Sequence, residues 1–326
     1  MPVFRKRNTF FTLFLIIISE LTLSSQEVSV YENYYLDLFI INPAATGVNY
    51  FPEADLSVRK QWVGFPDAPS TFLLAGNVRV GRKGFYDSRK FLNKNPLKMS
   101  GRVGLGASVF TDIDGPLTYT GGIFSYAYHL PVSSKSNISF GISAIVSHYA
   151  FNQSVLKPDQ PDDPYLLSGN DNVFSANFNL GIYFQNEDFF AGLSADKILP
   201  DFYTLHEDKK SQPSFFFLGG TKIKLSGNSV MLEPSVVIKK TGNTDPSIDF
   251  HTKLIIRRLT WIAISYSTTN KINFRFGLRL YKMLYAGYNY EYTLGDVASY
   301  SFGSHEIHLG INLGMAETEK NRNDRY

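Results

Sequence analysis

The chain has 326 residues, of which 19% are charged and 15% are aromatic, and it contains no cysteine. Soluble proteins usually carry about 25% charged residues, so this composition favours either an apolar environment outside the protein or an unusually aromatic core. The lack of cysteine excludes disulfides, thiolate zinc sites and cysteine nucleophiles.

Residues 1–25 have the pattern of a signal peptide. Three cations at positions 5–7 precede an apolar run over 10–18, and two small residues at 24 and 25 offer a cleavage site. The run is too short for a membrane-spanning helix, which needs about 20 apolar residues. Cleavage removes three cations and one glutamate, so the formal charge changes from 32 minus 29, or +3, to 29 minus 28, or +1. A charge this small argues against nucleic acid as a partner.

Residues 26–53 are too apolar for a free tail. They contain the aromatic residues Tyr31, Tyr34, Tyr35 and Phe39. We expect Asn42-Pro43 to form a turn and Gly47 to permit a tight bend. The segment is therefore predicted to pack in or under the domain that follows, as a plug or a periplasmic segment.

From residue 54 to 314 the chain shows one dominant pattern, the alternation of apolar and polar residues. Between 138 and 146 the even positions are apolar and the odd ones are mostly serine or glycine, and residues 174–184 repeat this split. A period of two is typical of strands with one apolar face. We count about fourteen such segments, starting near residues 54, 70, 98, 117, 136, 172, 188, 213, 228, 246, 259, 272, 283 and 302.

Three features favour a membrane barrel over a soluble sandwich. The polar faces carry glycine, serine and asparagine more than lysine and glutamate, aromatic residues gather near strand ends, and short and long connections alternate. The sequence therefore predicts an all-β fold: a transmembrane antiparallel β-barrel of about 14 strands over 54–314, with the N-terminal segment in or under its lumen. Residues 315–326 are expected to form a disordered periplasmic tail.

The stretch RKQWVGFPDAPST, residues 59–71, fits the first strand and its hairpin. Its alternation places Arg59 and Gln61 in the lumen and Lys60 on the lipid face, unless Lys60 lies close enough to the rim to snorkel. Trp62, and likewise Trp261, is predicted to be an interfacial anchor.

Charged and polar groups recur on the predicted lumenal face. The candidate lumenal groups are Arg59, Gln61, Lys222, Lys224, Lys253, Arg275, Arg279, Glu291, Glu306 and His308. They have two interpretations: a salt-bridged network that fills the lumen, or a path or selectivity surface for an ion or solute.

Motifs that could carry chemistry are weak. In SHEIH, residues 304–308, the strand period puts Glu306 and His308 on one face and His305 on the other, so three metal ligands do not converge. TDIDGP, residues 111–116, lacks most ligands of a calcium loop and reads as a hairpin turn. No nucleophile elbow is present. We therefore expect no enzyme activity, no cofactor and no metal site.

Several blocks resemble the PorP/SprF family of Bacteroidetes. They are YLDLFIINPAATG (35–47), RKQWVGFPDAPST (59–71), GLGASVFTDIDGPLTYTGGIFSYAYHLPV (104–132), FAGLSADKILP (190–200) and GSHEIHLGI (303–311). The resemblance implies an outer-membrane protein of the type IX secretion and gliding machinery that supports secretion or surface attachment of large client proteins. Its implied partners are outer-membrane lipid, secretion components on the periplasmic side and a client. The barrel alone leaves open a passive or gated channel for small solutes.

Overall fold

The structure is a computed structural model that describes residues 34–49, 52–80, 102–133, 135–152, 172–199, 212–226, 230–257, 259–281 and 283–313. The predicted signal peptide at 1–25 and the predicted tail at 315–326 lie outside these residues. No helix among the described residues is long and apolar enough to cross a membrane.

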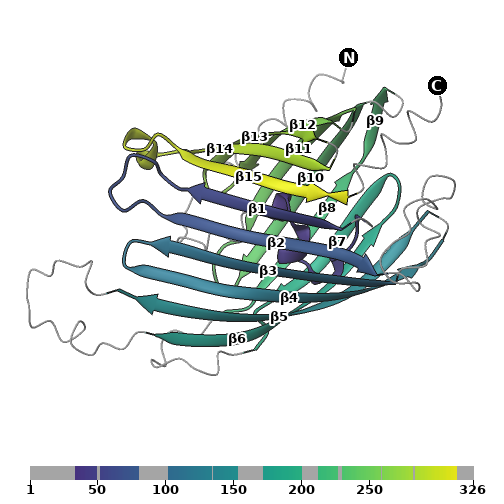
Figure 1. The fold of residues 1–326 in the computed structure, drawn as a ribbon, viewed down its shortest axis with the longest axis horizontal. Coiled ribbons are helices and arrows are strands. Elements are labelled where there is room, and N and C mark those ends of the chain that lie inside the picture. Colours follow the sequence, from purple (N-terminus) through teal and green to yellow (C-terminus); the bar gives the residue numbers. More distant parts are fainter. Residues whose placement is uncertain are drawn as a thin grey trace, which may run out of the picture.

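The chain is built almost entirely of antiparallel strands (Figure 1). The first eight are β1 (Glu53–Lys60), β2 (Ser70–Val80), β3 (Val103–Asp114), β4 (Leu117–Pro131), β5 (Asn137–Phe151), β6 (Val173–Gln185), β7 (Phe189–Asp196) and β8 (Ser214–Thr221). The others are β9 (Ile223–Ser226), β10 (Val230–Thr241), β11 (Ser247–Ile256), β12 (Thr260–Ser267), β13 (Lys271–Tyr281), β14 (Leu284–Thr293) and β15 (Ser304–Asn312).

Apart from β8 and β9, which do not pair with each other, each strand pairs with its neighbour in sequence, and the sheet closes where β1 pairs with β15. β8 and β9 both pair with β10, so they act as two parts of one strand and the barrel has 14 strand positions. This confirms the predicted fold class. Most predicted starts agree within two residues, but the third strand begins at Val103 instead of near 98.

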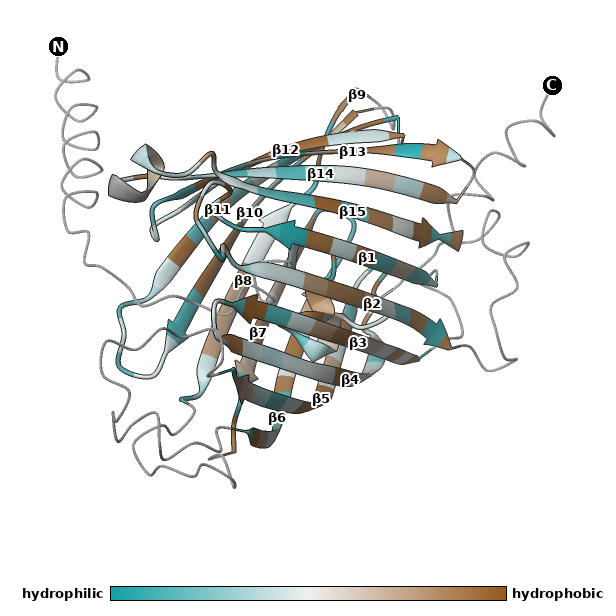
Figure 2. Cartoon of the chain, turned by 60° about the vertical axis from the view of Figure 1, so that its left-hand side comes forward, coloured by the Kyte–Doolittle hydropathy of each residue, from teal (hydrophilic) through white to brown (hydrophobic). Residues whose placement is uncertain are grey.

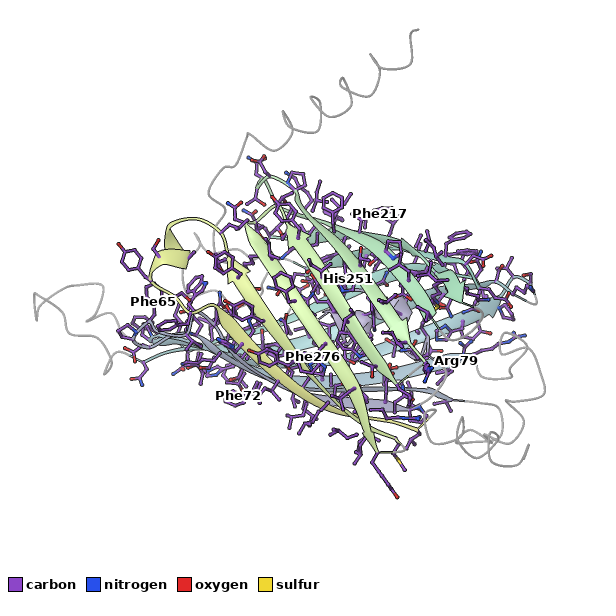
Figure 3. The ribbon with its side chains drawn as sticks, turned by 90° about the horizontal axis from the view of Figure 1, so that it is seen from above. Phe65, Phe72, Arg79, Phe217, His251 and Phe276 are labelled. Carbon is purple, nitrogen blue, oxygen red and sulfur yellow. The ribbon has the colours of Figure 1, made fainter. Side chains whose placement is uncertain are left out.

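The two faces of the wall have opposite chemistry. Outward side chains are large and apolar, and Phe72, Phe217 and Phe276 in Figure 3 are 46%, 42% and 45% exposed. Inward side chains are mostly serine, asparagine and buried charged groups. Figure 2 shows the resulting brown and teal banding along the strands. This inverted arrangement, apolar outside and polar inside, is that of a barrel whose solvent is lipid.

The two ends of the barrel differ in their connections. We call the end with the hairpin 61–69 and the segment 294–303 the loop end; it lies on the left in Figure 1. A short helix, η7 (Asp296–Ser299), belongs to this end. The opposite, turn end carries the short connections 132–136 and 186–188. The predicted turn within TDIDGP is present as a tight β3–β4 hairpin with Gly115 at φ +55.

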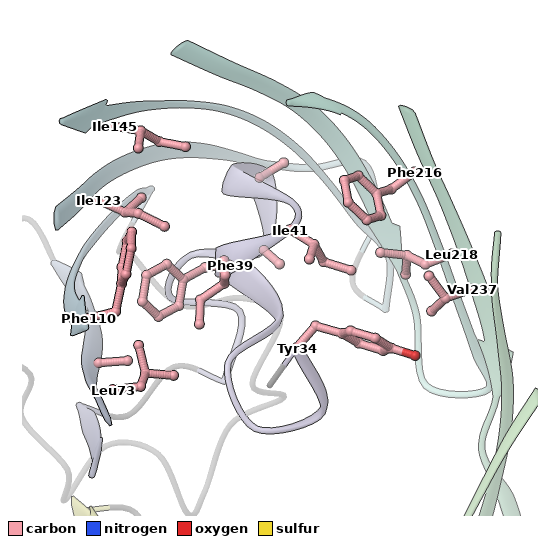
Figure 4. Close-up of a cluster of buried hydrophobic side chains, with 14 of the residues drawn as sticks. Tyr34, Phe39, Ile41, Leu73, Phe110, Ile123, Ile145, Phe216, Leu218 and Val237 are labelled. Atoms are coloured by element: carbon pink, nitrogen blue, oxygen red, sulfur yellow. The ribbon is translucent and has the colours of Figure 1, made fainter. Parts of the chain in front are cut away.

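Residues 34–48 of the predicted N-terminal segment lie inside the barrel, where they form the helices η2 (Leu38–Ile40) and η3 (Pro43–Ala45); residues 26–33 lie outside the described residues. Figure 4 shows its side chains between two parts of the wall: Phe39 faces the β2–β5 side, and Ile41 faces β8 and β10. Phe39 is 1% exposed and Ile41 is fully buried. The lumen therefore contains a small apolar core that residues 34–48 share with inward side chains of the wall, such as Phe110 and Leu218.

The reversed polarity predicts where a charge is tolerated. Val109, 55% exposed in the middle of β3, faces the lipid, so Val109→Arg should destabilise the barrel by about 2–4 kcal/mol. Val132, 66% exposed just beyond the end of β4, is the matched control, and Val132→Arg should cost less than about 1 kcal/mol. Urea unfolding in lipid vesicles, followed by loss of heat-modifiable migration, measures both. Equal costs at the two sites would contradict the assignment of the lipid face.

Candidate functional site

The candidate site is the lumen, where residues 34–48, which we call the plug, contact the inner wall. Asn42 anchors its centre, as the predicted Asn-Pro turn requires. Its Oδ1 accepts the Ala44 amide at 3.0 Å and so caps η3, while its Nδ2 donates to the carbonyls of Ile182 at 3.1 Å and Leu193 at 3.3 Å. One fully buried side chain thus ties the plug to the backbones of β6 and β7.

The wall accommodates the plug because glycines line its inner face. A Cβ at Gly141 would overlap the backbone of Pro43 and Ala44, and one at Gly181 would overlap the Asn42 side-chain oxygen. Gly104 and Gly106 receive Thr46 in the same way, with Phe39 also close to Gly106, and Gly192 receives the Asn42 side chain. We call these five glycines the seat. No larger residue permits so close a backbone approach.

Two polar contacts hold the plug on either side of Asn42. His129, which is fully buried, lies with Nε2 2.8 Å from the Thr46 carbonyl and Nδ1 2.7 Å from Ser139 Oγ. A carbonyl can only accept, so Nε2 carries the proton and Nδ1 accepts from the serine. On the other side, Ser194 Oγ donates to the Ile41 carbonyl at 2.6 Å. Backbone groups of the plug thereby find partners on the wall.

The first residues of the plug reach strands β11 and β13. Tyr34 donates from its hydroxyl to Asp249 at 2.9 Å, and burial raises the pKa of this phenol well above its usual range. The Tyr35 ring packs against His251 at 4.8 Å between ring centres and under the Arg275 guanidinium at 3.5 Å. Arg275 also donates to Ser265 at 2.9 Å. The predicted lumenal Arg275 is therefore a plug contact.

Arg59 is the centre of a separate buried network near the loop end. It is 2% exposed, and its guanidinium lies 2.9 Å from Glu291 and 4.0 Å from Glu306. Ser304 donates to Glu291 at 3.2 Å, and Ser57 donates to Glu306. Strand pairing explains the meeting, since Arg59 lies opposite Glu306 and Glu306 opposite Asn289. The geometry is that of the predicted salt-bridged network.

Trp261 corrects one prediction. It was predicted as an interfacial anchor but faces the lumen, where its ring stacks on His308 at 6.0 Å and Lys253 lies 4.8 Å from its centre. The reason is register: Ile262 and Ile264 are about half exposed to lipid, so the alternating neighbour Trp261 points inward. Its bulk is tolerated because Gly277 lies opposite it on β13.

The other predicted residues lie nearer the rims. Gln61 is buried and Trp62 is partly exposed at the loop end, where Trp62 Nε1 donates to Thr293 at 3.3 Å. Lys60 points outward and donates to the Ala68 carbonyl and to Ser70, as snorkelling to the rim requires.

At the turn end, Lys222 lies 5.7 Å from the centre of the Phe190 ring and Arg279 is partly exposed. Lys224 is exposed at this rim rather than enclosed in the lumen, because it belongs to the short segment β9 beyond the break after β8.

The described residues hold no group of three or more histidine, aspartate or glutamate side chains placed to bind a metal ion. In SHEIH, Glu306 and His308 are buried while His305 lies on the opposite face and contacts the Tyr288 hydroxyl at 2.5 Å. Sequence reasoning missed His129, Ser194 and the seat glycines as plug contacts. For the glycines, the sequence signal was their place on the polar side of the strand alternation, which indicates a close approach without identifying the approaching group.

A closed, lipid-facing barrel with a plugged lumen defines the class: an integral outer-membrane β-barrel protein. The particular family follows from comparison with family models, in which residues 23–311 match "Type IX secretion system membrane protein PorP/SprF". The chain belongs to this family, and the resemblance seen in the sequence is confirmed. It is therefore a membrane component of type IX secretion.

No protein among those with curated descriptions matches the chain. Several solved outer-membrane structures are similar at low identity. The CymD monoaromatic hydrocarbon channel shares 11% identity at a TM-score of 0.47, covering 84% of this chain and 91% of that one. The Acinetobacter baumannii outer membrane protein Omp33 shares 10% at 0.44, covering 81% and 97%. The P. putida toluene transporter TodX shares 8% at 0.45, covering 84% and 91%.

The seat can be tested by filling it. Gly141→Ala should displace the plug, since overpacking costs about 1–3 kcal/mol, or roughly 5- to 150-fold in a local opening equilibrium. Because the chain has no cysteine, Ala45→Cys in the plug provides a unique label, and its maleimide reaction rate reports opening. Gly122→Ala is the matched control, because a Cβ there has no neighbour closer than 3.4 Å. Equal labelling rates of Ala45→Cys in the Gly141→Ala and Gly122→Ala proteins would contradict the role of the seat in holding the plug.

Because Arg59 compensates two buried carboxylates, removing its charge should strongly reduce the stability of the barrel. Arg59→Met leaves Glu291 and Glu306 buried without their cation, which should destabilise the barrel by about 3–5 kcal/mol. Adding Glu291→Gln and Glu306→Gln should recover most of this loss in urea unfolding. Lys135→Met, which breaks the exposed Lys135–Glu187 pair, should have no measurable effect. A triple variant as unstable as Arg59→Met would show that the cation contributes something other than charge compensation.

Proposed function

We propose that this protein is a noncatalytic component of the type IX secretion and gliding machinery that supports secretion or surface attachment of large client proteins by docking partners. The observation that carries the proposal is the plug. Residues 34–48 lie in the lumen and pack against the inner wall through apolar and backbone contacts, so we expect that a client does not pass through this barrel. The protein would then contribute to secretion through its outer surface and its two ends.

The two ends suit different partners. Short turns face the periplasm and long loops face outward in outer-membrane barrels, which assigns the turn end to secretion components and the loop end to a client. At the loop end, the hairpin 61–69 and the segment 294–303 are joined by backbone bonds: Val63 donates to Gly303 at 2.8 Å, and Phe302 donates to Val63 at 2.7 Å. Together they hold Tyr300 and Phe302, which are 74% and 76% exposed, at the tip.

Exposed aromatic side chains on a rigid support favour protein contact. Aromatic residues are enriched at protein interfaces because they bury a large area at a small cost in side-chain entropy. Phe65, labelled at this end in Figure 3 and 39% exposed, extends the same tip. We assign this tip to the client and not to a lumenal solute.

Affinity purification from outer membranes tests the proposal. The tagged full-length protein should recover secretion components and at least one surface or secreted client. Tyr300→Ser combined with Phe302→Ser should reduce client recovery severalfold while leaving recovery of secretion components unchanged, because the two bind opposite ends. Asn243→Ser, at an exposed position of a different connection of the loop end, controls for nonspecific loss. Recovery of neither class of protein, from membranes in which the barrel is folded, would favour the alternative, a channel for small solutes.

A further inference from the structure

Asp37 is a buried carboxyl group for which the described part of the chain supplies no hydrogen bond. It precedes η2 in the plug, is 2% exposed, and neither of its side-chain oxygens has a hydrogen-bond partner among the described residues. It does not cap its helix, although aspartate commonly does so at this position. An ionised carboxylate in such a place loses its hydration without compensation. The Asp37 carboxyl must therefore either carry a proton or lie beside another source of positive charge.

The surroundings of Asp37 supply more negative charge. The groups of the wall that act on it are Glu53 and Asp55 of β1. Both already have donors: Glu53 accepts from Asn49 and Asn77, each at 3.0 Å, and Asp55 accepts from the Tyr285 hydroxyl.

The remaining titratable groups of this region do not compensate Asp37. Lys253 of β11 is attracted to Glu53 and Asp55 and to Glu233 of β10, and it lies over the Trp261 ring. The positive charge of Lys253 is thus already shared among Glu53, Asp55 and Glu233. Burial, and next the charges of Asp55 and Glu53, raise the pKa of the Asp37 carboxyl well above its usual range.

We propose that Asp37 is protonated when the plug is seated and that loss of this proton releases the plug from the β1 side of the lumen. Of the other plug contacts, those at Asn42, Ser194 and His129 are hydrogen bonds of neutral groups, while Tyr34 donates to Asp249 and Tyr35 packs under Arg275. Asp37 is the carboxyl residue within the plug itself, and its proton makes seating depend on pH. This inference concerns opening of the lumen and does not rest on the docking function proposed above.

The direction of the pH effect follows from linkage. The seated Asp37 has a raised pKa, whereas the released carboxyl returns to about 3.9. The seated plug is therefore most stable below about pH 4. Its stability falls as pH rises from there to the pKa of the seated carboxyl, with about a tenfold change in the seated-to-released ratio for each pH unit, and above that pKa there is no further loss.

The experiment uses the full-length protein in lipid vesicles with the Ala45→Cys label site, 6% exposed when the plug is seated. Maleimide labelling is followed from pH 5 to 9 in otherwise unchanged protein and in Asp37→Asn, which mimics the protonated group. Comparison at each pH cancels the intrinsic reactivity of the thiol. We expect the protein with Asp37 to be labelled faster than Asp37→Asn. The ratio of the two rates should grow about tenfold per pH unit up to the pKa of the seated carboxyl.

Two further variants keep the test decisive. Asp67→Asn, an exposed change in the hairpin 61–69, should leave the pH profile unaltered. Asp55→Asn removes a neighbouring charge while retaining a group that accepts the Tyr285 hydroxyl. It should therefore lower the pKa of the seated Asp37 carboxyl, narrow the pH range over which the plug is released, and reduce opening at high pH. If Asp37→Asn does not fold, this second variant alone decides. Identical pH profiles for unchanged protein, Asp37→Asn and Asp55→Asn would overturn the proposal.

Discussion

The fold depends on one close approach, that of the plug backbone to the inner wall at the glycine seat. A barrel of 14 strands encloses more space than its own inward side chains fill, because many of these are serine, asparagine or glycine. The plug fills that space with apolar residues such as Phe39 and Ile41, and Asn42 satisfies strand carbonyls that the approach exposes. Remove the room that Gly141 and Gly181 leave, and the plug cannot reach these carbonyls.

The lumen divides into three regions with different physical roles. The wall of β3 to β8 holds the plug through neutral hydrogen bonds and apolar packing. Near the loop end, Arg59 with its two glutamates joins β1, β14 and β15, the strands that close the barrel. Towards the turn end, Asp37, Asp55 and Glu53 concentrate negative charge where the plug meets β1. The first two regions favour a closed lumen. The third makes seating of the plug depend on the protonation of Asp37.

The sequence alone predicted much of this architecture. Period-two alternation identified fourteen strands and their faces, and the aromatic character of residues 26–53 predicted a segment in or under the lumen. It could not predict the seat, because Gly141, Gly181 and Asn42 are far apart in the chain and are brought together only by strand register. It misplaced Trp261 because residue type was given more weight than the register set by Ile262 and Ile264. It missed Asp37 because an unpaired carboxyl is visible only once its surroundings are known.

A closed lumen is the central claim, and single-channel recording in planar bilayers tests it most directly. The full-length protein should show no stable large conductance at rest near neutral pH, whereas Gly141→Ala, which crowds the plug out of its seat, should show frequent open events. Stable large conductance of the unaltered protein, equal to that of Gly141→Ala, would contradict the account.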